Sequence, residues 1–365
     1  MANTADIKKY SVVHIIDRLH TGGAERVLVT LANIFHQQGH AVTVITLVEQ
    51  GPLAAQLLPG IHQINLGRQQ KLNPVTMYRL VQAIKNIDIV HVHSSFNMRY
   101  VFLAGKLFNL QKAIFFHEHF GDIDIDTSVK WHQRYIYPKT IMICVSRRIA
   151  EWALQHLPVD ARNVFVLHNI VVKKEGLPKR MAQNNGYTKL VIVSNIRPTK
   201  NIEFAIELLN RLKQSRPCTL TIIGKKVDTA YYDELMALIE KYQLRNSVHI
   251  LDGVDEVQTL LHEFDIAVHT AKSESGPLVL IEYLAQSLPF VTYNTGETVL
   301  QVRDELPGCI AQTFELEEWE NKIEQILLQE REITEQQLQT IFERQFSTEA
   351  YYQHCMKIYN APSAP

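Results

Sequence analysis

Short runs of aliphatic and β-branched residues alternate along the chain with longer stretches whose apolar residues recur at helical spacing. In the first half, such runs predict strands at 11–16, 41–48, 88–93, 113–117, 140–145 and 164–167. Between the first two runs, apolar residues from Val27 to Phe35 follow a helical period, and Gly39 supplies a stop signal. This alternation is typical of βαβ units around a parallel sheet.

The pattern weakens between residues 171 and 189, where glycine, proline and asparagine are frequent, which predicts a linker. A second series of strands follows at 190–194, 219–224, 248–251, 266–270 and 290–293. Residues 315–359 are predicted to be helical, and aromatic residues concentrate near their end. We therefore expect an α/β chain with Rossmann-like domains at 1–170 and 190–345, and a C-terminal helix within 346–365 that packs back on the first domain.

Composition and charge exclude some functions. The hydrophobic content of 46% supports large cores, and a net charge of −1 gives no general attraction to nucleic acid. The first 170 residues carry 17 Lys and Arg against 11 Asp and Glu, whereas the remainder carries 20 against 27. This basic balance favours a peripheral contact between the first domain and an anionic membrane, and no nucleic-acid partner is expected.

The spacing of the cysteines and the length of the apolar runs favour a location in the cytoplasm. The four cysteines lie far apart and form no Cys-x-x-Cys, which argues against a disulfide framework or a metal cage. No signal-peptide pattern opens the chain, and no apolar run approaches the roughly 18 residues of a membrane span. We expect a cytoplasmic protein whose membrane contact, on the inner face, is peripheral.

The most informative segment is Lys-Ser-Glu-Ser-Gly-Pro-Leu-Val-Leu-Ile-Glu at 272–282, which follows a predicted strand and opens a helix. Glu274 lies in the loop and Glu282 lies more than one turn inside the helix. The amides near Leu278 and Val279 can receive a diphosphate through hydrogen bonds and the helix dipole. Taken alone, the two glutamates would be read as a cap residue and a solvated helix position.

The segment 272–282 resembles the Glu-x7-Glu signature of the retaining glycosyltransferase family 4, which has the GT-B fold. Other matches stand in the family's order: the Gly-Gly loop at 17–26, the strand 88–93, Phe-Phe-His-Glu-His at 115–119, and the stretches 166–169 and 193–201. The resemblance implies two parallel sheets that face each other across a cleft, with a nucleotide-diphosphate sugar as donor.

The resemblance also implies roles for individual residues. His119 is the better match to the family's cleft histidine, Glu274 would hold the donor sugar and Glu282 the ribose. Arg197 and Lys200 would neutralise the departing diphosphate together with the helix start. The residues expected to bind the donor are Gly22, Gly23, Asn195, Ser275, Gly276, Pro277, Leu278, Val279 and Glu282. On the acceptor side the expected residues are His117, Glu118 and Asn97.

One departure from the family pattern affects the phosphate-binding turn. The family commonly has Arg where this chain has Asn195, and Gly where it has Asn201. Arg197 is near enough in sequence to supply the missing guanidinium. The resemblance implies transfer with retention of anomeric configuration, without cofactor or metal. The expected acceptor is a glycan or lipid-linked molecule of surface polysaccharide or glycolipid synthesis.

Two metal-binding interpretations compete with this one. His91, His93, His117 and His119 form two His-x-His pairs at strand ends, which could place imidazoles on one face as in a metal hydrolase. No acidic ligand has matching spacing, so we expect cleft or core histidines and no metal. Asp122, Asp124 and Asp126 lack the glycine and the downstream glutamate of a calcium loop, and we expect a solvated or acceptor-side loop there.

Other functions remain as alternatives. An NAD-dependent oxidoreductase is disfavoured because Gly-x-Gly-x-x-Gly is absent after the first strand. A nonhydrolysing nucleotide-sugar epimerase on the same fold would form product without an acceptor. A nucleotide-sugar-binding protein without turnover, which the change at Asn195 would suit, would bind the donor and release no nucleotide diphosphate.

Overall fold

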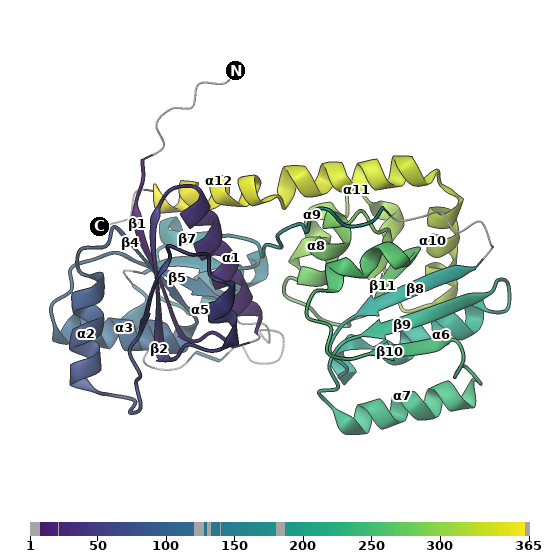
Figure 1. Cartoon of the computed structure of the whole chain (residues 1–365), viewed down its shortest axis with the longest axis horizontal. Coiled ribbons are helices and arrows are strands. Elements are labelled where there is room, and N and C mark those ends of the chain that lie inside the picture. The colour runs from purple at the N-terminus through teal and green to yellow at the C-terminus, as the bar shows by residue number, and fades with distance from the viewer. Residues whose placement is uncertain are drawn as a thin grey trace, which may run out of the picture. The chain divides into compact units, whose positions relative to one another are not determined.

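The computed structural model describes residues 8–20, 22–119, 128–129, 133–138, 140–179 and 187–361. The chain divides into two compact units, one formed by Met1–Ile170 with Tyr351–Pro365 and the other by Val171–Ala350. Each unit contains one sheet with helices on both faces, as the colours and labels of Figure 1 show. The predicted α/β class with two Rossmann-like domains is confirmed.

The sheet of the first unit has seven parallel strands in the order β3-β2-β1-β4-β5-β6-β7. The strands are β1 (Ser11–Arg18), β2 (Ala41–Glu49), β3 (His62–Asn65), β4 (Ile89–His93), β5 (Ile114–Glu118), β6 (Ile141–Cys144) and β7 (Val164–Val166). The sequence pattern predicted all of these except β3. That strand reads His-Gln-Ile-Asn and lies at the exposed edge, so it lacks the apolar run on which the prediction depends.

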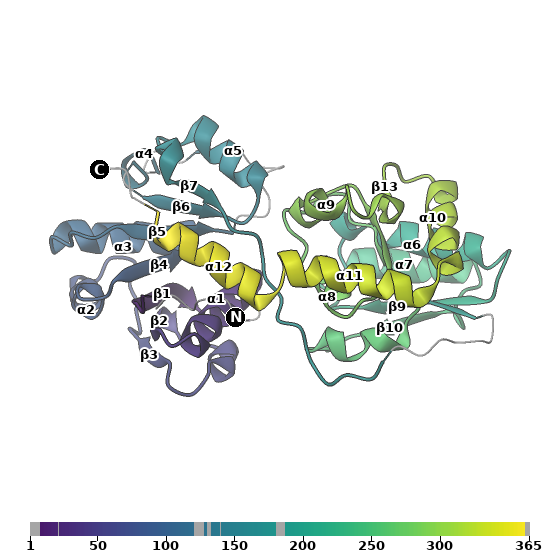
Figure 2. The ribbon, with the colours of Figure 1, turned by 90° about the horizontal axis from the view of Figure 1, so that it is seen from above.

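Helices cover both faces of this sheet. They are α1 (Gly23–Gln37), α2 (Pro74–Ile84), α3 (Ser95–Leu107), α4 (Gln133–Ile136), α5 (Arg147–His156) and, near the C-terminus, α12 (Thr348–Tyr359). Residues of α1 and α12 share one core with Val12 and Phe115, whereas α2, α3 and α5 pack with Val13 and Phe116. Successive strand residues therefore point into different cores, and one face carries α1 and α12 side by side (Figure 2).

The C-terminal segment returns to the first unit, where its aromatic residues are buried. Helix α11 (Arg331–Gln345) ends before α12 begins, and Tyr352 and Tyr359 of α12 are buried in the core of the first unit. The Tyr352 hydroxyl forms a hydrogen bond of 2.8 Å with His40 Nε2. The predicted packing of the C-terminal helix on the first domain is therefore present.

The sheet of the second unit has six parallel strands in the order β10-β9-β8-β11-β12-β13. The strands are β8 (Thr188–Val193), β9 (Cys218–Ile223), β10 (Val248–Leu251), β11 (Ile266–His269), β12 (Phe290–Tyr293) and β13 (Ile310–Ala311). The helices are α6 (Ile202–Leu212), α7 (Thr229–Lys241), α8 (Leu278–Ala285), α9 (Glu297–Val302), α10 (Leu316–Leu328) and α11. Among the described strands of this sheet, only β13 was not predicted, because a run of two residues has no period, and among the helices α9 was not predicted.

The stretch predicted as a linker runs along the second unit before β8 begins. No helix or strand forms between residues 171 and 179, and residues 180–186 lie outside the described part of the chain. The Lys174 amide donates to Gln258 Oε1 at 3.0 Å, and Gln286 Nε2 donates to the Lys174 carbonyl at 3.1 Å. These bonds fix the start of the stretch to the second unit.

Two further predictions concern the cysteines and the membrane. Cys144, Cys218, Cys309 and Cys355 are all buried and free, so they form no disulfide framework. Among the described residues, no helix combines the length and the apolar character needed to cross a bilayer.

Candidate functional site

In the second unit, the loops that follow β8 and β11 meet at the carboxyl edge of the sheet, where open α/β sheets bind ligands. The Lys272 amide donates to the Thr199 carbonyl at 3.1 Å, and Thr270 Oγ1 donates to the Lys200 carbonyl at 2.9 Å. These two bonds hold the loop after β11 against the turn after β8. The predicted donor residues of both loops are therefore brought together.

Two predicted residues form an ion pair at this place. Lys200 Nζ donates to Glu274 Oε1, and both side chains are largely buried, with exposed fractions of 13% and 14%. His269, at the end of β11, is buried, and its Nε2 lies 3.6 Å from the same carboxylate oxygen. Burial lowers the pKa of His269 to about 4, although Glu274 acts in the opposite direction. At neutral pH this set therefore contains one paired cation, one paired anion and a neutral imidazole.

The turn after β8 shows why asparagine can replace glycine there. Asn201 has a φ of 53°, in the left-handed region that glycine and asparagine tolerate best. It is buried between a 3₁₀ turn, Pro198–Lys200, and the start of α6. The departure from the family pattern therefore preserves the backbone conformation. Asn195 and Arg197 are both exposed on this turn, so the guanidinium is available at the surface of the same loop.

Helix α8 begins immediately after Pro277, which occupies the N-cap rather than the first turn that we predicted. Proline cannot cap a helix with its side chain, and no side-chain cap hydrogen bond is present at this end. The amides of the first turn, at Leu278 and Val279, therefore suit an anion. Glu282 lies in the second turn and is half-buried.

A glycine from the next loop packs against this segment. Gly296 has a φ of 85°, and a Cβ added there would lie 2.9 Å from Pro277 Cδ and 3.1 Å from Glu274 Cβ. The Glu297 amide donates to the Ser275 carbonyl at 2.9 Å, and the Glu274 amide donates to Thr295 Oγ1 at 3.3 Å. The loop after β12 thus fixes the backbone of 274–277, including Gly276.

In the first unit, the Gly-Gly loop leads directly into α1. The helix begins at Gly23 with Gly22 at the N-cap, and the Gly22 amide donates to the His20 carbonyl at 2.9 Å. A Cβ at Gly22 would lie 2.2 Å from Glu25 Oε2, so the carboxylate of Glu25 occupies the space that glycine leaves. Burial raises the pKa of Glu25.

Five histidines gather on one face of the first sheet, from the middle of β1 and β4 to the residue just after β5. They are His14, His91, His93, His117 and His119. His14 pairs in register with His91, and His93 pairs with His117. We call this group the histidine cluster. Sequence reasoning placed four of its members on one face and missed His14, which is a lone histidine in an apolar strand.

Hydrogen bonds connect part of the histidine cluster. His14 Nδ1 lies 3.2 Å from His93 Nε2, and His93 Nδ1 lies 3.1 Å from His119 Nε2. His91 Nδ1 lies 2.6 Å from the hydroxyl of Tyr359 in α12. Burial lowers the pKa of His14 and of His119 to about 3, and it lowers the pKa of the other three well below the usual value. The cluster is therefore neutral at physiological pH.

The other residues predicted on the acceptor side lie nearby. Asn97, in the first turn of α3, is buried and its Nδ2 donates to the His93 carbonyl and to Ser94 Oγ, both at 2.8 Å. Glu118 is buried on the opposite face from His117, in register with Cys144, as strand alternation requires. Asp122, Asp124 and Asp126 lie outside the described residues.

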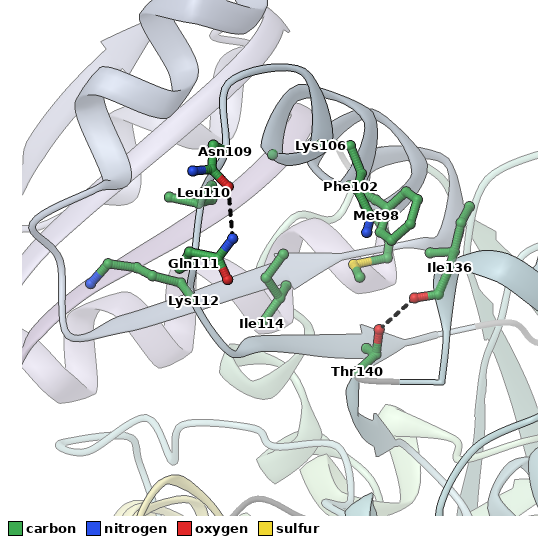
Figure 3. A pocket seen from close by; sticks show the side chains of 11 residues that line it. Met98, Phe102, Lys106, Asn109, Leu110, Gln111, Lys112, Ile114, Ile136 and Thr140 are labelled. Carbon is green, nitrogen blue, oxygen red and sulfur yellow. Dashed lines mark hydrogen bonds between the residues drawn. The ribbon is translucent and has the colours of Figure 1, made fainter. Parts of the chain in front are cut away.

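One hollow of the first unit lies away from the residues predicted to form the site. A hollow of about 300 Å³ lies between the end of α3 and the starts of β5 and β6, with Phe102, Lys106 and Ile114 in its wall (Figure 3). Those strand starts form the amino edge of the sheet, opposite the histidine cluster. The hollow therefore contains none of the predicted site residues.

Comparison with known families agrees with the positions of the motifs. The model of Glycosyltransferase Family 4 matches residues 21–174, and that of Glycosyl transferases group 1 matches residues 173–343. The two matches meet where the two compact units meet in the sequence.

Curated relatives match parts of the chain. The gpi3 subunit of phosphatidylinositol N-acetylglucosaminyltransferase from Schizosaccharomyces pombe is 24% identical over 60% of this chain and 49% of its own length. The chain therefore spans about half of that relative. An uncharacterized glycosyltransferase of Haemophilus influenzae is 22% identical over 77% of this chain and 79% of its own length.

Solved structures share the fold over nearly the whole chain. A glycosyltransferase from Rickettsia africae has a TM-score of 0.79 at 18% identity, covering 96% of this chain and 98% of its own. Alr3699/HepE from Anabaena, solved with UDP and glucose, has a TM-score of 0.76 at 16% identity and covers 97% and 100%. At such identities the likeness supports the GT-B fold alone.

Proposed function

The chain belongs to the GT-B glycosyltransferases of family 4 and group 1, and from this premise we propose that it transfers a sugar from a nucleotide diphosphate to an acceptor with retention of configuration. The observation that supports this proposal best is the buried Lys200–Glu274 pair beside the uncapped start of α8. An ammonium, a carboxylate and free amides are the groups needed for a diphosphate and a sugar hydroxyl.

Departure of the nucleotide diphosphate creates negative charge that the protein must stabilise. We assign this role to Lys200, Arg197 and the amides of Leu278 and Val279, with no divalent ion on the phosphates. Glu274 accepts hydrogen bonds from the donor sugar hydroxyls, and Glu282 binds the ribose. The ion pair between Lys200 and Glu274 compensates both buried charges. When the donor binds, its phosphate replaces Glu274 as the partner of Lys200, and its sugar hydroxyl replaces Lys200 as the partner of Glu274.

Retention needs no separate base if the leaving phosphate accepts the proton of the attacking hydroxyl. This front-face route suits a site in which the buried histidines are neutral and Glu118 faces away from them. His119 contacts the donor sugar or the acceptor, and His117 and Asn97 support it from the acceptor side.

For the donor we propose a UDP-sugar first, since the structural neighbour Alr3699/HepE was solved with UDP and glucose. For the acceptor we propose a glycan or lipid-linked molecule of surface polysaccharide or glycolipid synthesis. The excess of basic residues in the first 170 residues is compatible with a peripheral contact at the inner face of an anionic membrane.

A thermal-shift panel tests the donor site. UDP, GDP, ADP and CMP are each added to the full chain, with Mg²⁺ or with EDTA. A nucleotide at about 100 times its dissociation constant should add roughly 2.7 kcal/mol to the free energy of unfolding. We expect UDP to raise the melting temperature equally with Mg²⁺ and EDTA. A shift that requires Mg²⁺ would contradict the metal-free phosphate site.

Two further measurements separate the proposal from its alternatives. Glu282→Ala should weaken UDP binding, and unchanged affinity would remove the ribose role. Release of UDP that depends on an acceptor distinguishes transfer from the nonhydrolysing epimerase, which forms product without acceptor. A protein that binds UDP-sugar and releases no UDP with any acceptor extract would be a binding protein.

A further inference from the structure

The histidine cluster contains more buried imidazole nitrogens than its hydrogen bonds use. Among the described residues, neither ring nitrogen of His117, which is fully buried, has a hydrogen-bond partner, and the same holds for His14 Nε2 and His91 Nε2. A buried polar group without a partner costs about 1–3 kcal/mol, and such groups in native proteins commonly mark an ion or a water. His117 therefore points to a ligand within the cluster.

Three members of the cluster have the spacing of a metal site. One nitrogen of each of His93, His117 and His119 lies within 4.8 Å of the others. Tetrahedral coordination at about 2.1 Å would place nitrogens about 3.4 Å apart, and the His93 Nδ1 and His119 Nε2 atoms are already 3.1 Å apart. The His117 and His119 rings lie with their centroids 4.1 Å apart, so His117 must turn away from His119 and bring one nitrogen from within 4.8 Å to about 3.4 Å of the other two.

The surroundings supply what a bound metal needs beyond its ligands. His93 uses its other nitrogen, Nε2, toward His14 Nδ1 at 3.2 Å, which is the outer-shell hydrogen bond that fixes a metal-bound imidazole. His119 is only partly buried, so an ion can enter beside it. The Asp17 carboxylate lies 3.5 Å from Asn97 Nδ2, which also contacts the His93 carbonyl, and so places negative charge near the cluster.

The same evidence disfavours the second triad, His14–His91–His93. All of its members are fully buried, which leaves an ion no entry path. His93 would also have to bind through Nε2 and lose its contact with His14. From these observations we propose that His93 Nδ1, His119 Nε2 and a nitrogen of His117 bind one Zn²⁺ ion, with the fourth position open to water. Three imidazoles without thiolate or carboxylate favour Zn²⁺ over Mg²⁺.

This site is separate from the proposed phosphate site, whose residues all belong to the second unit. The zinc ligands His117 and His119 are also the residues to which the proposed function gives contacts with the sugar or the acceptor, and zinc on His119 Nε2 would leave only Nδ1 of that ring for such a contact. A failure of UDP to bind would leave the zinc site standing, and a failure of zinc to bind would leave the donor site standing.

The test is zinc titration of the full chain without a histidine tag, after removal of metal by a chelator. A competing zinc dye reports affinity, elemental analysis reports stoichiometry, and Co²⁺ substitution reports tetrahedral geometry through its visible absorption. We expect one zinc per chain, a rise in melting temperature with Zn²⁺ and none with Mg²⁺. Wild-type protein that is folded and retains no zinc against the dye would overturn the proposal.

Variants then assign the ligands. His119→Gln, at the most exposed ligand, and His117→Gln should each abolish stoichiometric zinc, whereas His14→Asn should weaken binding by about 10- to 100-fold as an outer-shell change. His62→Gln, on the exposed edge strand β3, is the matched control and should bind like wild type. Loss of zinc in His91→Asn together with full binding in His119→Gln, both with native circular dichroism, would assign the other triad and contradict ours.

Discussion

The two units bury polar groups at the carboxyl edges of their sheets in opposite ways. In the second unit, Lys200 and Glu274 carry opposite charges, and the ion pair between them offsets the cost of burying each charge. In the first unit, the histidine cluster avoids charge, since burial keeps every ring neutral at physiological pH. Paired charges suit a diphosphate that arrives and departs as an anion, whereas neutral donors and acceptors suit hydroxyl groups. Under the proposed function, this difference gives separate tasks to the charged region, which we define as Lys200, Glu274 and His269, and to the neutral region, which is the histidine cluster.

Removing the cation of the charged region should have the largest effect. Lys200→Gln keeps most of the side-chain length and removes the charge. It should lower kcat for transfer by about 10²- to 10³-fold, as expected when a group that stabilises developing negative charge is lost. Steady-state assays of UDP release measure this. The change also leaves Glu274 without its cation, so circular dichroism and melting must show an intact fold.

Lys272→Gln is the matched control for this change. Lys272 lies in the loop after β11, which also carries Glu274, and its Nζ lies 3.3 Å from Glu203 Oε1 in a more exposed pair. Such surface pairs contribute about 0–1 kcal/mol. We expect kcat within a few-fold of wild type, and a loss as large as that in Lys200→Gln would show that loop charge in general, rather than Lys200, supports transfer.

The neutral histidine of the charged region, His269, should make the free energy of unfolding decrease at acid pH. His269 has a pKa of about 4 in the folded chain, below the usual value of 6.5, mainly because it is buried. Its contribution to stability is complete above pH 6.5 and is lost as the pH falls from 6.5 toward 4, because the unfolded chain binds the proton first. The loss amounts to at most about 3 kcal/mol.

Urea unfolding at several pH values measures this loss. In His269→Asn, the free energy of unfolding should decrease less between pH 6.5 and 4 than in wild type, because one titrating group is gone. The neutral region contributes its own acid sensitivity to both proteins and cancels in the comparison. Parallel pH curves would contradict the assignment.

The packing of the charged region depends on a glycine outside the predicted motifs. Gly296→Ala places a Cβ against Pro277 and Glu274 in a backbone with φ of 85°. It should destabilise the chain by about 2 kcal/mol and weaken UDP binding, since the start of α8 must shift. Gly308→Ala is the control, because nothing lies within 4 Å of the added Cβ. Equal melting temperatures for the two variants would contradict this role.

The sequence predicted those features that depend on local pattern. Periodicity placed the long buried strands and failed at β3 and β13, one polar and one very short. The motif 272–282 placed Glu274 in a loop and Glu282 inside a helix, as the structure has them. The sequence did not predict that Lys200 and Glu274, which lie 74 residues apart in the chain, form an ion pair with each other.

The same limit explains the residues that were missed. His14, His269 and Gly296 belong to no motif, and each acts through a neighbour on another strand or loop. His14 could have been found from the predicted sheet, because a parallel sheet brings polar residues of adjacent strands together once the strand order is known. No sequence pattern marked Gly296, because its role depends on the atoms of Pro277 and Glu274 that pack against it in the folded chain.

The smallest expected effect concerns the neutral region and its C-terminal helix. Tyr359→Phe removes the hydroxyl that lies 2.6 Å from His91 Nδ1 and leaves that nitrogen buried without this partner. The loss should destabilise the chain by about 1 kcal/mol. Tyr351→Phe, on the same helix, is the matched control, because the buried Tyr351 hydroxyl has no hydrogen-bond partner in the described part of the chain and its removal should be neutral or slightly stabilising. Urea unfolding of both variants measures the difference. If the two variants lose equal stability, then the hydrogen bond between Tyr359 and His91 contributes nothing measurable to the packing of α12 on the first unit.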